Sequence, residues 1–143
     1  MKLLLKGLFL MFRLNNKGQS LVMFVILIPI ILLIITLVYD VGTAIYEKNS
    51  LSNTSYIIID YGLDNIDSVS ESELIDIIIK NNDLNYVSVN IDNNVIDVIL
   101  KKNIKGIVGK IFNFNLTHVS THYRGYMDNM EKIIERVEWY YGW

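Results

Sequence analysis

The 143 residues contain no cysteine, which excludes disulfide bonds, thiolate metal sites and a cysteine nucleophile. No Asp or Glu occurs before Asp40, although the chain has fifteen acidic residues. Proline occurs once, at Pro29. An apolar core alone must therefore hold any folded part together, and the two ends of the chain differ sharply in charge.

One uncharged run dominates the N-terminal part. It extends over nineteen residues from Leu21 to Tyr39. At about 1.5 Å rise per residue, a helix of that length covers roughly 28 Å, close to the ~30 Å hydrocarbon thickness of a bilayer. No small-residue cleavage site follows the run, so we expect one retained membrane helix rather than a secretory signal that is removed.

Charge placement predicts the orientation of this helix. Four basic residues precede the run, whereas nine basic and fifteen acidic residues follow it, giving +4 and −6 around the span. Short basic flanks stay in the cytoplasm, so we expect the N-terminus inside and the C-terminus outside. The external part is acidic as a whole, and neither nucleic acid nor an anionic lipid surface is expected to bind it. The four basic residues also share one side of a helix, which either describes an interfacial leader helix or arises by chance. They are Lys2, Lys6, Arg13 and Lys17.

Four segments follow from these patterns. We expect a cytoplasmic leader at 1–18, a transmembrane helix at 19–39, an external continuation of that helix at 40–62 and an external head at 63–143. Apolar residues spaced by three, four and seven continue past Asp40 and support the continuation. Asn15, Asn16 and Gly18 should break the chain before a helix that begins near Ser20. Gly62 is the predicted helix stop, with Leu63 folding back onto Ile58.

The head is predicted to be α+β: the long helix packs on a small antiparallel sheet of about three strands with short helices. A capping box at Ser70 and Glu73 predicts a helix that ends near Asn81. Alternating apolar residues on either side of Asn93 and Asn94 predict a hairpin with a two-residue turn. The remaining expected elements are an amphipathic helix at 104–111, a third strand at 116–123 and a last helix that Asp128 and Glu131 cap, with Met130, Ile133, Ile134 and Val137 on its apolar face.

Catalytic and metal motifs are sparse. His118 and His122 have the spacing of a zinc pair on a helix but lie in a predicted strand, where positions four apart are about 13 Å from each other. The acidic residues Asp64, Asp67, Asp92 and Asp97 do not match a calcium loop. We therefore predict neither an enzyme nor a cofactor or metal site. The aromatic end, Trp139 to Trp143, suits either an interface, a return to the membrane surface or a cover for the sheet edge.

The junction Gly18-Gln19-Ser20 resembles the processing site of type IV pilin-like proteins. Pro29 inside the span and the stretch with Asp40, Gly42, Ala44 and Tyr46 extend the resemblance to the TadE/TadF-like pseudopilins of tight-adherence (Flp) pilus systems. The resemblance covers roughly 17–53. It implies that a prepilin peptidase cuts after Gly18 and leaves Gln19 as the first mature residue. It also implies other pilin-like subunits, the membrane platform of the assembly machine and the lipid bilayer as partners.

Met23 departs from this family pattern, because pilin-like chains usually carry Glu at the fifth mature position. That carboxylate is thought to meet the N-terminal amine of a neighbouring subunit, which a thioether cannot do. The resemblance therefore predicts a minor pilin or pseudopilin that acts in assembly or initiation, held in the cytoplasmic membrane or extracted into an external pilus. The alternative is an uncleaved bitopic membrane protein whose external domain senses or scaffolds. Taken singly, Pro29 suits a plain kink, Gly42 a close helix approach and Asp40 a mark of the water interface.

Overall fold

The computed structural model describes residues 16–113, 115 and 117–138. The predicted leader helix up to Asn15 and the aromatic end from Trp139 to Trp143 lie outside these residues. The chain divides into two compact units, Met1–Tyr39 and Asp40–Trp143, which are described separately below.

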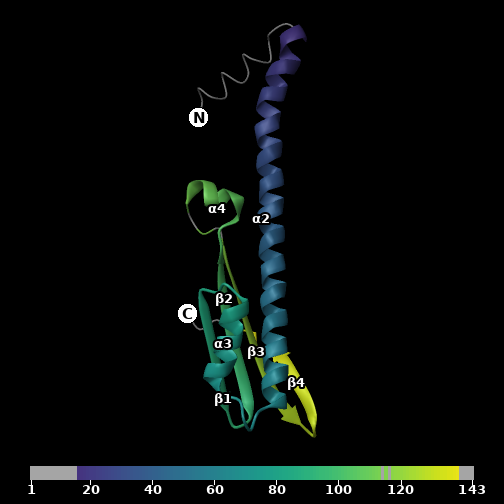
Figure 1. The fold of residues 1–143 in the computed structure, drawn as a ribbon. Helices are drawn as coiled ribbons and strands as arrows, with labels where there is room; N and C mark the ends of the chain where they lie inside the picture. The colour runs from purple at the N-terminus through teal and green to yellow at the C-terminus, as the bar shows by residue number, and fades with distance from the viewer. Residues whose placement is uncertain (1–15, 114, 116, 139–143) are drawn as a thin grey trace. The chain divides into compact units, whose positions relative to one another are not determined.

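Helix α2 runs from Asn16 to Asp64, is 49 residues long and contains Pro29 (Figure 1). It begins earlier than predicted, because Asn16 and Gly18 lie inside it. A glycine costs a helix only about 1 kcal/mol, which a long apolar helix tolerates near its end.

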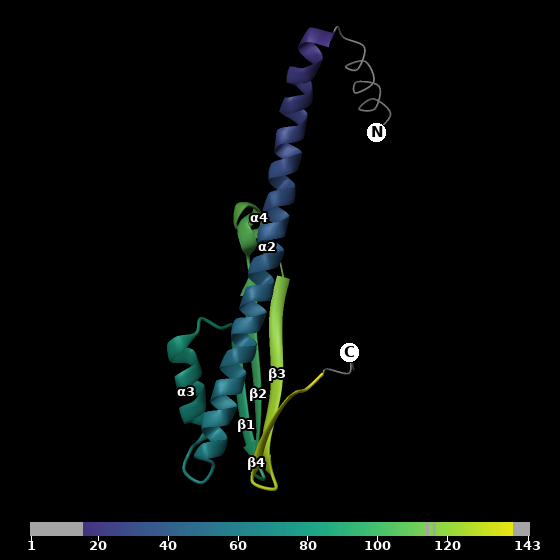
Figure 2. The ribbon, with the colours of Figure 1, turned by 90° about the vertical axis from the view of Figure 1, so that its right-hand side faces the viewer.

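The unit Asp40–Trp143 contains a four-stranded antiparallel sheet in the order β1-β2-β3-β4. The alternating side chains Ile96, Val98 and Leu100 of β2 are fully buried, so one face of the sheet carries the core. Figures 1 and 2 show the strands alongside the C-terminal half of α2 and the short helix α3. The strands are β1 (Tyr86–Asp92), β2 (Val95–Ile104), β3 (Thr117–Asp128) and β4 (Glu131–Arg136), and the shorter helices are α3 (Glu71–Asn81) and α4 (Gly106–Phe112).

The core of this unit joins both helices to the sheet. Leu51 and Ile59 of α2 and Leu74 and Ile78 of α3 are at most 2% exposed and belong to the same apolar cluster as β2. Ser55 and Thr121, also buried, place their hydroxyl oxygens 3.2 Å apart and add one polar link between α2 and β3.

Several predicted elements are confirmed. The side chain of Ser70 accepts a hydrogen bond from the backbone N–H of Glu73 and caps α3. Asn93 and Asn94 have φ angles of 48° and 62° and form the turn between β1 and β2. Positive φ at both turn residues is typical of a two-residue hairpin that matches the twist of its strands.

The predicted last helix is wrong, because residues 131–136 form β4. Asn129 and Met130 have φ angles of 47° and 68°, and Asp128 pairs with Glu131 across them. This second two-residue turn sends the chain back along β3, so the sheet has four strands rather than about three, and β3 continues to Asp128 instead of ending near Tyr123.

Gly62 does not stop α2, which ends two residues later at Asp64. A Cβ at Gly62 would lie 2.6 Å from Cδ1 of Ile96 and 3.2 Å from Cδ1 of Leu74. The glycine therefore allows α2 to approach β2 and α3 closely, a role that the sequence pattern of a helix end also fits.

Candidate functional site

The apolar run of α2 is exposed along its length. Leu21, Met23 and Val38 are 72%, 54% and 68% exposed, and Pro29 is exposed as well. Within Ser20–Asp64, an 18-residue window reaches a mean hydropathy of 3.4, so by length and composition this helix could cross a membrane once. Among the residues that the structure describes, nothing covers this surface, and a large exposed apolar surface is typical of contact with lipid or with another protein.

Gly18 lies at the N-terminal end of this surface. It is exposed, and no heavy atom lies within 4 Å of the position that a Cβ would take. Nothing that the structure describes around Gly18 explains a glycine there. Among the described residues, the side of α2 at Gly18 is therefore open to solvent.

Asp40, the residue after the run, is completely buried within the unit Asp40–Trp143. Its carboxylate accepts a hydrogen bond of 2.6 Å from the backbone N–H of Ile107 and one of 3.2 Å from that of Val108. These are orphan donors of the first turn of α4, and Lys105, the residue before α4, supplies no side-chain cap. Asp40 therefore caps a helix that lies 67 residues away in sequence.

Gly106 makes this contact possible. It has a φ of +60°, and a Cβ there would lie 2.6 to 2.7 Å from the carboxylate atoms of Asp40. Only glycine adopts this conformation easily and leaves space for the carboxylate. We name Asp40, Gly106 and the two amide groups the Asp40 cap.

The other residues of the family-like stretch do not gather at this cap. Gly42 is exposed with no heavy atom within 4 Å of a Cβ, so no described helix approaches it. Ala44 is half-buried and packs against the core, whereas Tyr46 is 71% exposed. The stretch therefore combines one inward contact with an open surface on α2.

A second polar cluster lies on the sheet face away from the core. Arg124 donates to both carboxylate oxygens of Asp97 at 3.0 and 3.1 Å, and Nε2 of His122 lies 3.1 Å from Oδ1 of the same group. The hydrogen bonds and charge of Asp97 raise the pKa of Arg124 above its usual value. His118 is exposed and paired with Asn103, four strand positions from His122. Among the described residues, no group of three His, Cys, Asp or Glu could hold a metal ion.

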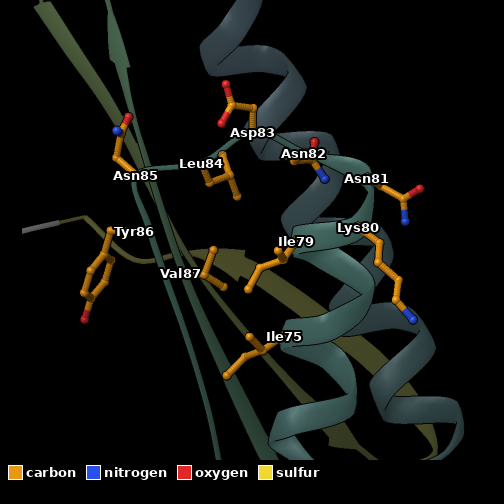
Figure 3. A pocket seen from close by; sticks show the side chains of 10 residues that line it. All are labelled: Ile75, Ile79, Lys80, Asn81, Asn82, Asp83, Leu84, Asn85, Tyr86 and Val87. Carbon is orange, nitrogen blue, oxygen red and sulfur yellow. The ribbon is translucent and has the colours of Figure 1, made fainter.

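An open groove of about 640 Å³ lies between the end of α3 and the start of β1 (Figure 3). Ile75, Ile79 and Val87 line one part of the groove, and the amides of Asn81 and Asn82 lie toward its other end (Figure 3). The lining contains one carboxylate, Asp83, and one amine, Lys80, with no histidine or hydroxyl nucleophile other than the phenol of Tyr86. It lacks the paired groups of acid–base or nucleophilic catalysis.

The comparisons with known proteins agree with the exposed helix. Residues 18–61 match the model of the TadE-like protein family. No curated protein and no solved structure matches the chain. The matched range begins at Gly18 and includes the apolar run, Asp40 and most of the packed part of α2. Residues 18–61 are therefore similar to the TadE-like protein family, and this similarity covers the apolar run and most of the packed part of α2.

Proposed function

We propose that this chain is a minor pilin or pseudopilin that acts in the assembly or initiation of a Tad/Flp-type pilus or secretion pseudopilus. The TadE-like match at 18–61 carries the proposal, because it coincides with the exposed apolar helix. Such a helix can be stored in a bilayer and later pack among like helices, so assembly needs no catalytic group.

We further propose processing by a prepilin peptidase after Gly18, with the leader in the cytoplasm and the head outside. The start of the family match at Gly18 supports this step, because it coincides with the junction at which cleavage is expected. The basic leader supports the orientation through the preference of positive charge for the cytoplasmic side. The membrane platform and other pilin-like subunits would then be the partners.

Processing is tested by sequencing the N-terminus of protein from the native membrane. Gln19 should be the first residue, and Gly18→Val should leave the full-length chain. Gly42→Val is the matched control, because this glycine of α2 also has no heavy atom within 4 Å of a Cβ, and it should be processed normally. Intact Met1 chains from cells with an active prepilin peptidase would favour the uncleaved bitopic alternative instead.

Orientation is tested with single cysteines, which are specific labels because the chain has none of its own. In intact cells that carry the Gly18→Val chain, which should keep its leader, a membrane-impermeant thiol reagent should label Asp67→Cys, which is exposed in the head, but not Asn15→Cys in the leader. The opposite pattern would reject the N-in arrangement.

A further inference from the structure

The charge of the external part is uneven. No acidic residue occurs between Asp97 and Asp128, although this part of the chain is acidic as a whole. Lys102 pairs with Glu47 at 2.9 Å, and the amine of Lys101 lies 5.1 Å from the ring centre of Tyr86. Lys105 and Lys110 are exposed and have no ion pair among the described residues. Lys105 directly precedes α4, and Lys110 lies in its last turn.

Helix α4 also exposes apolar side chains. Ile107 and Ile111 are 39% and 70% exposed and lie one helical turn apart on the same side. The helix lies past the ends of β2 and β3, away from both hairpin turns (Figure 1). Among the described residues, α4 therefore presents an exposed apolar side next to two exposed lysines.

The Asp40 cap holds the apolar side of α4 close to the residue at which the apolar run ends. Asp40 directly follows Tyr39, the last residue of the apolar run, and its carboxylate holds the first turn of α4. If the run spans the bilayer, α4 is hydrogen-bonded to the residue at which the span ends. The two lysines and the two exposed isoleucines of α4 would therefore lie close to the point at which the chain leaves the membrane.

We propose that α4 lies on the outer surface of the membrane, with Ile107 and Ile111 in the headgroup region and Lys105 and Lys110 on anionic lipid headgroups. Short apolar contacts combined with lysines are the usual basis of attraction to an anionic bilayer surface. The inference rests on the membrane insertion in the proposed function but not on processing. Asp40 and Gly106 act as positioning residues, because they hold α4 at this depth.

The test uses the full chain in phospholipid vesicles, with an environment-sensitive fluorophore on a single cysteine and doxyl-labelled lipid as quencher. Ile111→Cys should be quenched at least about twofold more than Ile57→Cys. Ile57 is a matched control, since it is also aliphatic and 64% exposed, but lies in the middle of the packed part of α2. Equal quenching at the two sites would overturn the proposal. It would leave a protein partner as the alternative cover for the apolar side of α4.

Lipid charge and the cap are then varied. Quenching at Ile111→Cys should be stronger in phosphatidylcholine with phosphatidylglycerol than in phosphatidylcholine alone, and Lys105→Gln with Lys110→Gln should remove that difference. Asp40→Ala and Gly106→Ala should lower the quenching, whereas Gly42→Ala, in open space, should not. No dependence on lipid charge would overturn the anionic assignment, and unchanged quenching in both cap variants would overturn the positioning role.

Failure of this proposal differs from failure of the proposed function. Purified chain is used, so the absence of cleavage after Gly18 would not alter the quenching. Extraction of the vesicles with alkaline carbonate checks the shared premise, because release of the chain would reject the membrane helix itself and both proposals with it.

Discussion

At the scale of single residues, Asp40 gains a contact that its place in the sequence does not reveal. A carboxylate at the end of an apolar run is typical of a membrane interface, and that is all its neighbours indicate. Its two donors come from Ile107 and Val108, and the distance in sequence hides the pairing. In the folded structure, Gly106 fits this contact because its φ is +60° and it has no Cβ to collide with the carboxylate.

The buried hydroxyl pair should behave as a coupled unit. Ser55→Ala or Thr121→Val alone leaves a buried hydroxyl without its partner, and each should destabilise the head by about 1–2 kcal/mol. The double variant should cost less than the sum, because both polar groups are then gone. Urea unfolding of the four proteins measures the coupling. Strictly additive values would show that water, rather than the partner, satisfies each group.

Lys132 should make stability depend on pH in the alkaline range. Hydrogen bonds to Asp60 at 2.7 Å and contact with Asp64 at 2.8 Å raise the pKa of Lys132 above its usual 10.5. A raised pKa in the folded state means that the stabilisation is fully present below 10.5 and disappears as the pH rises through the folded value.

We therefore expect Lys132→Gln to lower the urea midpoint at neutral pH and to match the parent protein well above pH 10.5. The effect should be small because the group is exposed. Lys48→Gln, at an exposed lysine of α2 without an ion pair among the described residues, is the control. A difference that persists unchanged at high pH would assign the effect of Lys132→Gln to lost packing.

At the scale of elements, local signals predicted most of the head. The Ser70 cap and the Asn93-Asn94 turn combine residue types with few alternatives, and both are confirmed. The last helix was wrong because Asp128 and Glu131 also suit the ends of a tight turn. Asn129 and Met130 adopt positive φ, and methionine gives no warning of this conformation.

The close packing at Gly62 predicts a size-dependent rescue. Gly62→Ala should destabilise the head by about 1–3 kcal/mol, because the new methyl group meets Cδ1 of Ile96 at 2.6 Å. Ile96→Val removes that carbon, so Gly62→Ala with Ile96→Val should be more stable than the sum of the single effects predicts. Thermal or urea unfolding decides, and a simple helix stop at Gly62 would show no such coupling.

At the scale of the whole molecule, the head should fold without the apolar run. A chain that starts at Asp40 keeps the whole core cluster and should be soluble and unfold cooperatively in urea. A chain that starts at Asp64 loses Leu51, Ile58 and Ile59 and should aggregate through the uncovered sheet face. If the shorter chain folds equally well, the packing of α2 on the sheet is not required for stability.

Met23 should limit the number of copies in a filament. It is exposed on α2 and has no charge to meet the amine of a neighbouring subunit. An acidic side chain at that depth costs up to roughly 3 kcal/mol on insertion, so methionine favours a subunit that stays in the membrane or at an end. Quantitative mass spectrometry of sheared filaments should find few copies, and Met23→Glu should not improve function. Abundance equal to that of a major subunit would reject this role.

The candidate site was only partly predictable. The apolar run, Gly18 and Pro29 are visible in the sequence because membrane helices depend on local composition. The Asp40 cap, the open space around Gly42 and the free lysines beside α4 depend on contacts between distant segments, which one sequence does not reveal.

The Asp40 cap also has a consequence for biogenesis. If the head is exported as proposed, Asp40 reaches the outside long before Ile107, whose N–H is 67 residues further along the chain. In that interval the carboxylate has no cap donors and must stay hydrated, so it keeps the nascent helix from sliding deeper into the lipid. When the rest of the head arrives, the amides of α4 replace that water. The carboxylate of Asp40 would then first limit how far the helix inserts, and its hydrogen bonds with α4 would later stabilise the folded head.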